Sequence, residues 1–358
     1  METRENQNNQ TFVEGKASVA IQIPTTISKK MPVFYNPSMA LNRTLSILVL
    51  EALEKTQMKA ALALEGSGIR AVRMLLELPE EKIKELYIND ISQRAIEKIH
   101  EHLILNGIKN KARVSRKDAS VFLLEHKPFS YIDLDPFGSP NPYLDAACKA
   151  ITHQGVLSIT ATDTAALTGT YPKTCLRKYW AQPLRNAAMH EIGLRILIRK
   201  VQLIGVQYEK ALLPILSYSK DHYYRIFFEA RHGKQACDAL VQDHGFYISC
   251  KNCLWHKGKR NKEGEDKSTK TTKNLLGDYK TCPHCKYKPL DLAGPLYVGN
   301  LFREPVIKTI RELANTGMQK QHLSQADKKF LATLEQEATY EMICKKEGKQ
   351  SIGMYDLH

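Results

Sequence analysis

Short apolar runs alternate with segments of helical periodicity through the first half of this chain, and no other feature restricts the fold as strongly. The apolar runs have the length and composition of buried strands and lie at 60–64, 86–88, from 114 onward, 131–134 and 156–160. Apolar residues recur at helical spacing in the segments 44–56, 69–78, 92–106, 119–124 and 143–151. This alternation predicts an α/β fold with a mostly parallel, doubly wound, Rossmann-like sheet.

The pattern changes beyond residue 166. The sequence there predicts a long helix at 184–204, antiparallel strands at 211–216 and 224–229, and helices from 306 onward that include the amphipathic segment 324–344. A chain of 358 residues is long enough for two hydrophobic cores. We therefore expect an N-terminal Rossmann-like domain over residues 1–165 and a C-terminal α/β domain over 166–358, with the boundary within 164–171.

The fourth predicted strand ends in an unusual way, with the residues YIDLDPFGSP at 131–140. The apolar part favours a buried strand, and Asp-Pro followed by Gly-Ser-Pro stops that strand abruptly. Ligands of open α/β sheets bind at the carboxyl ends of the strands. Asp135 and Phe137 are therefore expected at the edge of the sheet where ligands bind.

A glycine-rich turn follows the first predicted strand, where GSGIRA at 66–71 matches the pattern G-x-G-x-x-G/A. Such a turn can be no more than a turn, but Gly66 and Gly68 would also let a ligand approach the backbone. Asp90 ends the second strand, 22 residues after Gly68, where an acid can accept hydrogen bonds from ribose. Asp118 ends the third strand and can address an adenine edge or cap the next helix. Together these residues predict a site for an adenosine-containing cofactor, and both NAD and S-adenosylmethionine satisfy it.

The residues after the fourth strand favour methyl transfer over hydride transfer. An exocyclic amine on a base is a poor nucleophile because its lone pair is conjugated with the ring. The Asp135 carboxylate and a backbone carbonyl could accept hydrogen bonds from the amine and orient the lone pair, while Phe137 stacks on the base. Nothing later in the chain resembles a hydride-transfer site. A dehydrogenase with the same glycine turn is the competing prediction.

The charge of the chain points to a polyanionic partner. There are 52 Lys and Arg against 38 Asp and Glu, a formal net charge of +14. Such a surface can bind nucleic-acid phosphates, although a generally basic surface is the plainer explanation. The first ten residues are polar and no run of eighteen apolar residues occurs, so we expect neither a signal peptide nor a membrane span. A cytoplasmic, monomeric protein is the expectation.

Four of the eight cysteines form two Cys-x-x-Cys pairs. Cys250 with Cys253 and Cys282 with Cys285 can supply four thiolates to a tetrahedral ion, so a zinc knuckle with structural Zn²⁺ is predicted. The alternatives are iron, disulfides, and substitution by His256 or His284. The lysine-rich segment 257–273 is predicted to be a mobile loop. Its basic residues, with Lys286, suit nucleic-acid phosphates or are merely solvated.

Several longer motifs make the family resemblance specific. They are PVFYNP at 32–37, ALNR at 40–43, GIR at 68–70, NDIS at 89–92, DLDPFG at 133–138, TATDT at 160–164, GTYPKTC at 169–175 and PLRN at 183–186. In this order, and over residues 12–353, they resemble the tRNA guanine-26 N2-dimethyltransferases. Those enzymes use S-adenosylmethionine to place two methyl groups on the exocyclic amine of a tRNA guanine.

The resemblance implies roles for individual residues. The cofactor site would be lined by Arg43, Arg70, Asp90, Asp118 and Ala119. Asp135 and the Pro136 carbonyl would hold the guanine amine, and Phe34 and Phe137 would clamp the base. Two of these residues have plainer explanations from patterning, since Phe34 can be a core aromatic and Arg43 a solvated charge on a helix.

Two departures from the family pattern stand out. Leu62 occupies a position that is usually acidic, and Glu65 precedes Gly66-Ser67 where a small residue is usual, so Glu65 either contacts the cofactor or sits beside it. The family commonly continues into a basic, aromatic tail with an Arg-Thr-His-Phe motif, whereas this sequence ends at His358. An inactive or weakened tRNA-binding protein of the same fold is therefore the alternative function.

Overall fold

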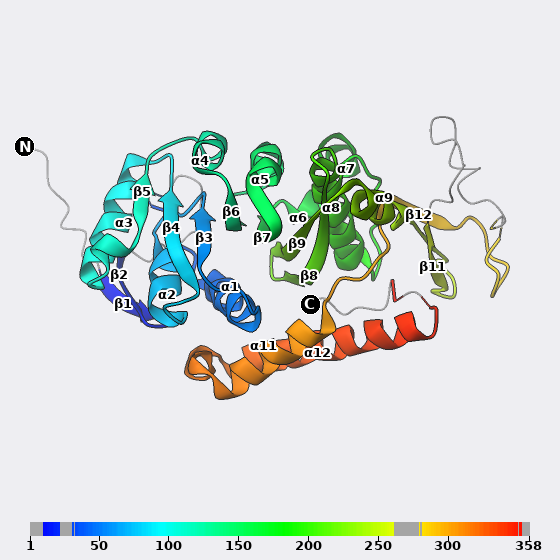
Figure 1. Cartoon of the computed structure of the whole chain (residues 1–358). Coiled ribbons are helices and arrows are strands. Elements are labelled where there is room, and N and C mark those ends of the chain that lie inside the picture. Colours follow the sequence, from blue (N-terminus) through cyan, green and yellow to red (C-terminus); the bar gives the residue numbers. More distant parts are fainter. Residues whose placement is uncertain are drawn as a thin grey trace, which may run out of the picture. The chain divides into compact units, whose positions relative to one another are not determined.

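The structure is a computed structural model that describes residues 10–21, 31, 33–260, 279, 281–349 and 351–352. The chain forms two compact units, and each is discontinuous in sequence (Figure 1). Unit 1 consists of Met1–Phe137, Ala150–Ser158 and Pro305–Glu335, and unit 2 consists of Gly138–Lys149, Ile159–Glu304 and Gln336–His358. The division at 165/166 stays a prediction for separately folding domains, since the compact units interleave along the chain.

Unit 1 is built on parallel strands. Its sheet has the order β5-β4-β3-β6-β7, and the strands are β3 (Met58–Leu62), β4 (Ile83–Asn89), β5 (Arg113–Ser115), β6 (Phe129–Leu134) and the first part of β7 (Ile151–Ala161). β3 pairs in parallel with both β4 and β6, and β4 with β5. In this register Leu62 of β3 lies beside Ile88 and Asp133, so the carboxyl ends of three strands meet at one edge.

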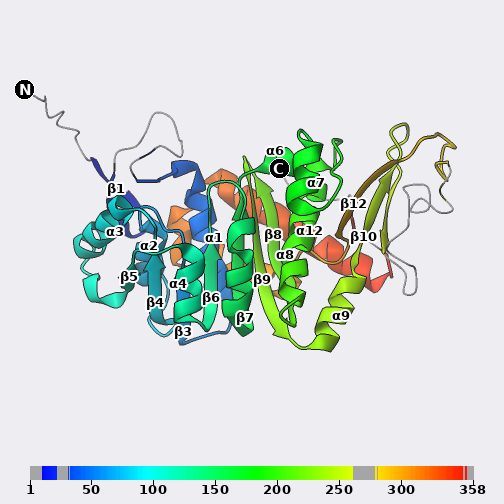
Figure 2. The same cartoon turned by 90° about the horizontal axis from the view of Figure 1, so that it is seen from above.

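Helices follow the strands as the alternation predicts. They are α1 (Ala40–Ala52), α2 (Ile69–Glu77), α3 (Gln93–Leu105), α4 (Ala119–His126), α11 (Glu304–Thr316, of unit 1 from Pro305) and the first part of α12 (Gln325–Lys346). α1, α2 and α3 pack together on one face of the sheet and α4 covers the other (Figures 1 and 2). The unit also contains the antiparallel hairpin β1 (Gln10–Glu14) and β2 (Ala17–Ile21) and the short 3-10 turns η1 (Pro37–Met39), η2 (Lys109–Lys111) and η4 (Met318–His322).

Unit 2 is mixed. Its helical elements are η3 (Asn141–Tyr143), α5 (Leu144–Ala150, of this unit to Lys149), α6 (Thr164–Leu167), α7 (Pro172–Tyr179), α8 (Met189–Val206), α9 (Lys234–Gln242) and the second part of α12. The end of β7 is followed in strand order by β9 (Tyr223–His232) and β8 (Lys210–Lys220), which pair antiparallel. A separate antiparallel sheet has the order β11 (His256–Arg260), β10 (His244–Ser249) and β12 (Asp291–Tyr297).

The predicted fold class is confirmed, and the differences are local. The helix expected from residue 184 begins at Met189, because Gln182 and Gly294 pair their backbones and Asn186 accepts a hydrogen bond from Ala188 N before the helix starts. The loop expected at 257–273 is wrong for residues 257–260, which form β11 because β10 pairs with them. The rest of that segment lies outside the described residues. Among the described helices, none is long and apolar enough to cross a membrane.

Candidate active site

The glycine turn lies between β3 and α2 and takes a backbone conformation that glycine favours. Gly66 has φ +55° and Gly68 has φ +76°, both in the left-handed region. A Cβ atom on Gly66 would lie 3.0 Å from the carbonyl oxygen of Phe34, and one on Gly68 would lie 2.9 Å from the Ile99 side chain. The turn is therefore packed directly against Phe34, so that the predicted cofactor loop and one of the predicted clamp residues are neighbours.

Asp90 ties this turn to the next strand end. Its Oδ2 accepts a hydrogen bond from Gly66 N at 2.9 Å, and its Oδ1 accepts one from Ser92 N at 2.8 Å. Ser92 in turn caps α3 through its side chain. Because a carboxylate oxygen has two lone pairs, Asp90 retains acceptor capacity for the hydroxyls of a ribose.

Asp118 and Ala119 lie at the third strand end. Asp118 Oδ1 accepts hydrogen bonds from Ser120 N at 2.9 Å and Val121 N at 3.2 Å, so the capping role that the sequence left open is present. The side chain is exposed, and within the described part of the chain its other oxygen makes no hydrogen bond. Ala119 is buried beside it. Capping leaves one carboxylate oxygen of Asp118 available for a ligand.

Arg70 joins the glycine turn to the end of β6. Its guanidinium lies on the first turn of α2, is buried, and donates to Asn42 Oδ1 at 3.0 Å and Ser46 Oγ at 2.8 Å from α1. Its other terminal nitrogen forms an ion pair with Asp135 Oδ2. Asp133 Oδ2 lies 3.7 Å from the same guanidinium. The carboxylate of Asp135 is thus held at the sheet edge by a cation that is itself fixed by neutral hydrogen-bonding groups.

Asp135 keeps one oxygen for a ligand. Its side chain is 18% exposed, and within the described residues only Oδ2 is bonded, to Arg70. Pro136 is buried and Phe137 is exposed, so the chain emerges from the core over these three positions. Asp133, one position below the edge, accepts a hydrogen bond from Tyr131 at 2.6 Å and is buried. The geometry therefore separates a structural carboxylate from an available one.

Phe34 and Phe137 are brought together at this edge. Their ring centroids lie 4.6 Å apart with an interplanar angle of 68°, an edge-to-face contact. Phe34 is half-buried and Phe137 is 40% exposed, so Phe34 lies at the surface of the site and not in the core. A base stacked between two parallel rings needs a separation of roughly 7 Å, twice the stacking distance of bases. The two rings must therefore move apart to admit a base.

Arg43 is buried, so the interpretation as a solvated charge is wrong. Its side chain is 7% exposed and donates to Glu14 Oε1 at 2.6 Å, and Tyr35 donates to Glu14 Oε2 at 3.0 Å. Burial opposes charge on Glu14, but Arg43 and Arg73 together hold the pKa of this carboxyl below its usual value. Sequence reasoning missed Glu14, because an acid in a short N-terminal strand has no local signal for a partner 29 residues away.

Glu65, the residue that departs from the family pattern, turns toward the start of α2. Its Oε1 accepts a hydrogen bond from Ala71 N at 2.9 Å. Burial raises the pKa of Glu65 to about 8, against the opposing effect of the Arg70 guanidinium. The residue therefore lies beside the glycine turn as a carboxyl group that favours its protonated form near neutral pH.

Unit 2 holds the segment that follows Phe137, through residues to which sequence reasoning assigned no role. Gly138 N donates to Thr162 Oγ1 at 2.6 Å, and Gly138 O accepts from Thr162 N at 2.9 Å. Ser139 Oγ lies 2.9 Å from the Tyr179 hydroxyl, which donates to Asp163 at 2.6 Å. The motif at 160–164 supplies Thr162 and Asp163, so its place in the resemblance was the available signal for these two, whereas Tyr179 lies outside every motif.

The four cysteines of the two pairs converge. Their Sγ atoms all lie within 4.8 Å of one another, and Cys250–Cys285 and Cys253–Cys282 are 3.6 and 3.5 Å apart. A disulfide requires about 2.05 Å between sulfurs, so that alternative does not describe this structure. Four thiolates at about 2.3 Å from a central ion would be about 3.8 Å apart in a tetrahedron. The spacing therefore fits a tetrahedral metal site.

The two cysteine pairs have the same turn. Leu254 N donates to Cys250 O and Lys286 N donates to Cys282 O, at 3.0 and 2.9 Å. Leu254 and Lys286 both have a positive φ, +60° and +62°. His256 instead contacts the carbonyl of Leu254, and His284 is exposed, so neither belongs to the group of four among the described residues. Two equivalent knuckles therefore face one another.

Comparison with known proteins decides the family. A model described as N2,N2-dimethylguanosine tRNA methyltransferase matches residues 14–349. The chain belongs to this family. The resemblance expected from the sequence motifs is thereby confirmed.

Two family relatives and one solved structure give the extent of the similarity. The chain is 39% identical over 351 residues to the tRNA (guanine(26)-N(2)/guanine(27)-N(2))-dimethyltransferase of Aquifex aeolicus, covering 96% of this chain and 82% of that protein. It is 37% identical over 292 residues to the tRNA (guanine(26)-N(2))-dimethyltransferase of Methanothermobacter thermautotrophicus, covering 80% and 72%. The structure of Trm1 from Pyrococcus horikoshii with S-adenosyl-L-methionine superimposes with a TM-score of 0.75 at 31% identity, covering 91% and 83%.

Proposed function

We propose that this family member transfers methyl groups from S-adenosylmethionine to the N2 amine of guanine 26 in tRNA, and that it adds two. The observation that carries the proposal is the Asp135 carboxylate, held by Arg70 on one oxygen and available on the other, at the end of β6. The names of the relatives and the cofactor of the Pyrococcus horikoshii structure support the reaction class. We propose that it acts in the cytoplasm as a monomer.

The residues at the strand ends fit an adenosine-containing cofactor. The turn at Gly66 has no space for a side chain, and Asp90 presents a partly exposed carboxylate at the adjoining strand end. Asp118, Ala119, Arg70 and Arg43 would complete the cofactor site. S-adenosylmethionine supplies an activated methyl group on a positively charged sulfur when it is bound. The turn at Gly66 and Gly68 and the Asp90 carboxylate would hold the nucleoside part of the cofactor. Methyl transfer would then take place at the sheet edge that carries Asp135.

Asp135 is proposed to activate the guanine amine by orientation. Its Oδ1 and the Pro136 carbonyl accept hydrogen bonds from the two N–H groups and direct the lone pair away from the ring plane. Arg70 keeps the carboxylate in a single position through Oδ2. The proton that the amine loses passes to Asp135 or to solvent. After the first transfer the amine retains one N–H, so a single acceptor, Asp135 or the Pro136 carbonyl, orients it for the second transfer.

Phe34 and Phe137 are proposed to clamp the base. Their edge-to-face contact at 4.6 Å opens as the guanine enters, and each ring then covers one face of the base. Thr162, Ser139 and Tyr179 hold the backbone just after Phe137 through their hydrogen bonds within unit 2. In the proposed clamp, the backbone next to Phe137 is therefore held by hydrogen bonds, and Phe34 packs on the glycine turn.

We propose structural zinc at the four cysteines. Such an ion would join the knuckle before β11 to the knuckle before β12, and all four protein ligands would leave no open position for catalysis. Metal analysis of the purified protein should find about one zinc per chain. Cys282→Ser should lose the zinc and lower the melting temperature, whereas Cys237→Ser, at a buried cysteine outside the cluster, should retain it. Iron in place of zinc would overturn the metal assignment.

Mass spectrometry of nucleosides tests the reaction. Unmodified tRNA is incubated with the protein and S-adenosylmethionine carrying a labelled methyl group, then digested to nucleosides. Labelled N2,N2-dimethylguanosine is the expected product. Tight tRNA binding without any labelled product would instead favour the inactive, tRNA-binding alternative, and binding of NAD in preference to S-adenosylmethionine would favour a dehydrogenase.

A further inference from the structure

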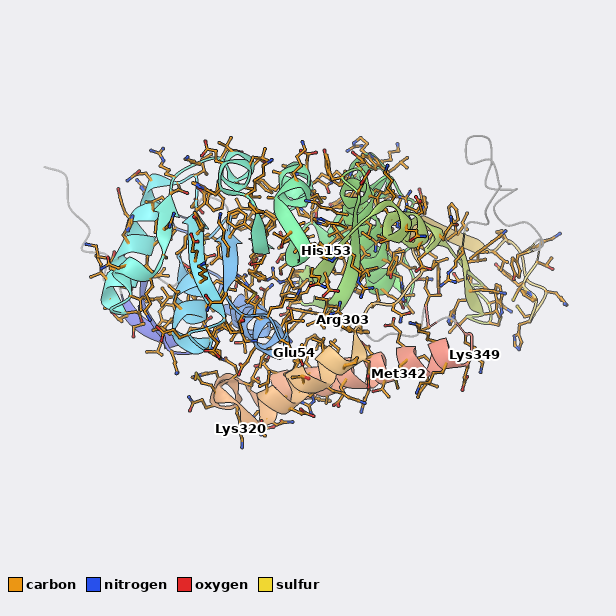
Figure 3. All side chains as sticks on the ribbon, in the orientation of Figure 1. Glu54, His153, Arg303, Lys320, Met342 and Lys349 are labelled. Atoms are coloured by element: carbon orange, nitrogen blue, oxygen red, sulfur yellow. The ribbon has the colours of Figure 1, made fainter. Side chains whose placement is uncertain are left out.

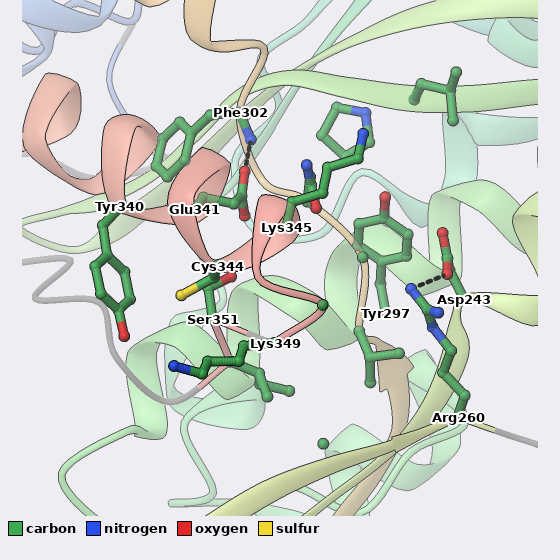
Figure 4. A pocket seen from close by; sticks show the side chains of 18 of the residues that line it. Asp243, Arg260, Tyr297, Phe302, Tyr340, Glu341, Cys344, Lys345, Lys349 and Ser351 are labelled. Carbon is green, nitrogen blue, oxygen red and sulfur yellow. Dashed lines mark hydrogen bonds and ion pairs between the residues drawn. The ribbon is translucent and has the colours of Figure 1, made fainter.

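A cleft of about 1020 Å³ lies within unit 2, at a distance along the chain from every residue of the proposed methyl-transfer site (Figure 4). Its walls come from the C-terminal end of α12 and the residues after it, from β11, from the start of β8 and from the loop that follows β12. Figures 3 and 4 label Lys349 on one wall, and Figure 3 labels Arg303.

The lining is strongly cationic. Six positively charged side chains line it, namely Arg231, Lys257, Arg260, Arg303, Lys345 and Lys349. The lining contains two carboxylates, and both are engaged. Asp243 pairs with Arg260 at 2.9 Å, and Glu341 accepts hydrogen bonds from Leu301 N and Phe302 N at 2.7 and 3.0 Å. The charge inside the cleft is therefore left largely uncompensated by the lining itself.

Arg231 and Arg303 share the Glu229 carboxylate, at 3.4 and 2.6 Å, and the other four cations are available to a ligand. Lys257 and Lys345 take part in no ion pair among the residues that the structure describes. The side chains of Arg260 and Lys349 are 56% and 69% exposed, and those of their partners Asp243 and Glu347 are 32% and 50% exposed. Exposed ion pairs contribute little free energy, so a phosphate can replace the carboxylate at small cost. Several cations can thus neutralise phosphates at once.

Aromatic rings accompany the charge. Tyr297 and Phe302 are buried in the lining, while Tyr340 on α12 is 39% exposed (Figure 4). An exposed aromatic ring among lysines and arginines is the combination by which proteins hold single nucleic-acid strands, through base stacking and phosphate contacts. An acidic protein surface would use the charges but has no need of the ring.

We propose that this cleft binds a stretch of the sugar-phosphate backbone of tRNA, with Lys257, Lys345 and Lys349 on phosphates and Tyr340 against a base. The proposal rests on the proposed function for its substrate, and adds to it a docking site separate from the methyl-transfer residues. The volume exceeds what one nucleotide fills, which suits a strand that passes through. Affinity for tRNA at this site should fall steeply with salt, because phosphate contacts release counterions.

Charge reversal on α12 tests the proposal against a matched control. The double variant Lys345→Glu with Lys349→Glu changes two lining residues, whereas Lys329→Glu with Lys346→Glu makes the same change in charge at exposed positions outside the lining. The lining variant should bind tRNA roughly tenfold more weakly at moderate salt, and its slope of log affinity against log salt should fall by about 2. The control should remain near the wild type.

A second pair of variants tests the ring. Tyr340→Ala should weaken tRNA binding, while Ile343→Ala, exposed on the same helix but outside the lining, should not. Binding of S-adenosylmethionine by the lining variants should equal that of the wild type, which shows that they are folded.

Three outcomes distinguish the proposed RNA site in the cleft from the proposed methyl transfer. Equal tRNA affinity for the lining variants and their controls would overturn the cleft as an RNA site, whether or not the wild type methylates tRNA. Loss of guanosine monophosphate binding in the lining variants with tRNA binding intact would overturn it in favour of a small-nucleotide site. Wild-type tRNA binding that depends on the cleft, without methyl transfer, would support the cleft and contradict the proposed reaction.

Discussion

The arginines of the strand-end site in unit 1 and the cations of the cleft in unit 2 are neutralised in different ways. The side chains of Arg43 and Arg70 are 7% and 5% exposed, and each is bonded to a carboxylate within its own unit. In the cleft, Arg260 and Lys349 are more than half exposed, and their partners Asp243 and Glu347 are partly exposed. The first set has fixed partners and the second has partners that a ligand can replace.

This difference separates two uses of positive charge. A buried guanidinium whose N–H groups are already bonded holds its carboxylate partner in one orientation, as Arg70 does for Asp135. It has few N–H groups left to bind a polyanion. An exposed cation with a weak partner remains free to bind phosphate. The position of each cation's carboxylate partner is therefore a better guide to function than the net charge of +14.

The largest effect is expected at Asp135. Asp135→Asn retains the shape but loses the charge that pairs with Arg70, and the amine then faces an amide in place of a carboxylate acceptor. Methyl transfer should fall by about 10²–10³-fold, the usual cost of removing one oriented group at a reacting centre. Single-turnover rates with saturating tRNA and cofactor measure it.

The control for this variant is Asp145→Asn, an exposed carboxylate paired with Lys149 on the surface of unit 2. It should transfer at the wild-type rate. An Asp135→Asn protein that binds cofactor normally and transfers at the control's rate would remove Asp135 from the mechanism.

Measurements of protein stability test the difference between buried and exposed ion pairs most directly. Arg43→Ala leaves Glu14 buried with Arg73 as its remaining ionic partner among the described residues, and should lower the free energy of unfolding by about 3 kcal/mol. Arg260→Ala removes a pair whose arginine is 56% exposed and should cost less than about 1 kcal/mol. Urea denaturation of both variants measures the contrast. Equal losses would mean that exposure does not distinguish the two regions.

The clamp should have a smaller effect than the carboxylate. Phe137→Ala removes one stacking surface, and a base–aromatic stack is worth roughly 1–3 kcal/mol, so kcat/KM for tRNA should fall about 10- to 100-fold. Phe137→Tyr, which retains the ring, should recover most of this loss. If alanine and tyrosine variants behave alike, the ring does not stack on the substrate.

Glu65 should give an effect that is spread over several pH units and visible as a pH dependence of stability. Its pKa is raised to about 8 in the folded protein from about 4.5, so the folded state retains a proton that the unfolded state loses over this range. Stability should therefore fall as the pH rises from 4.5 to 8, by less than about 1.4 kcal/mol per pH unit for one group. Glu65→Gln should flatten this part of the curve. Parallel curves for the two proteins would assign the dependence to other groups.

Sequence patterns predicted the features that depend on residues close together in the chain. The strands and helices of the first half, the glycine turn and the convergence of Cys250, Cys253, Cys282 and Cys285 all follow from spacing along the chain. Each depends on periodicity, turn chemistry or a repeated ligand pair, which are visible within a few residues.

Long-range partners were beyond these patterns. The sequence contains no sign that Arg70 would bond Asn42, Ser46 and Asp135, or that Glu14 would neutralise Arg43. The cleft of unit 2 is also assembled from α12, β11 and β8, which are separated by up to about a hundred residues. The interleaved units have the same origin, because contacts between distant segments decide which parts of the chain fold together.

The most direct test of the account replaces the amine and leaves the protein unchanged. Two tRNA transcripts are compared that differ only at position 26, one with guanine and one with inosine, which lacks the N2 amine that Asp135 is proposed to hold. The account predicts that the wild-type protein transfers labelled methyl groups to N2 of the guanine and none to position 26 of the inosine transcript, while both bind with similar affinity. Methyl transfer to the inosine at a comparable rate would contradict it.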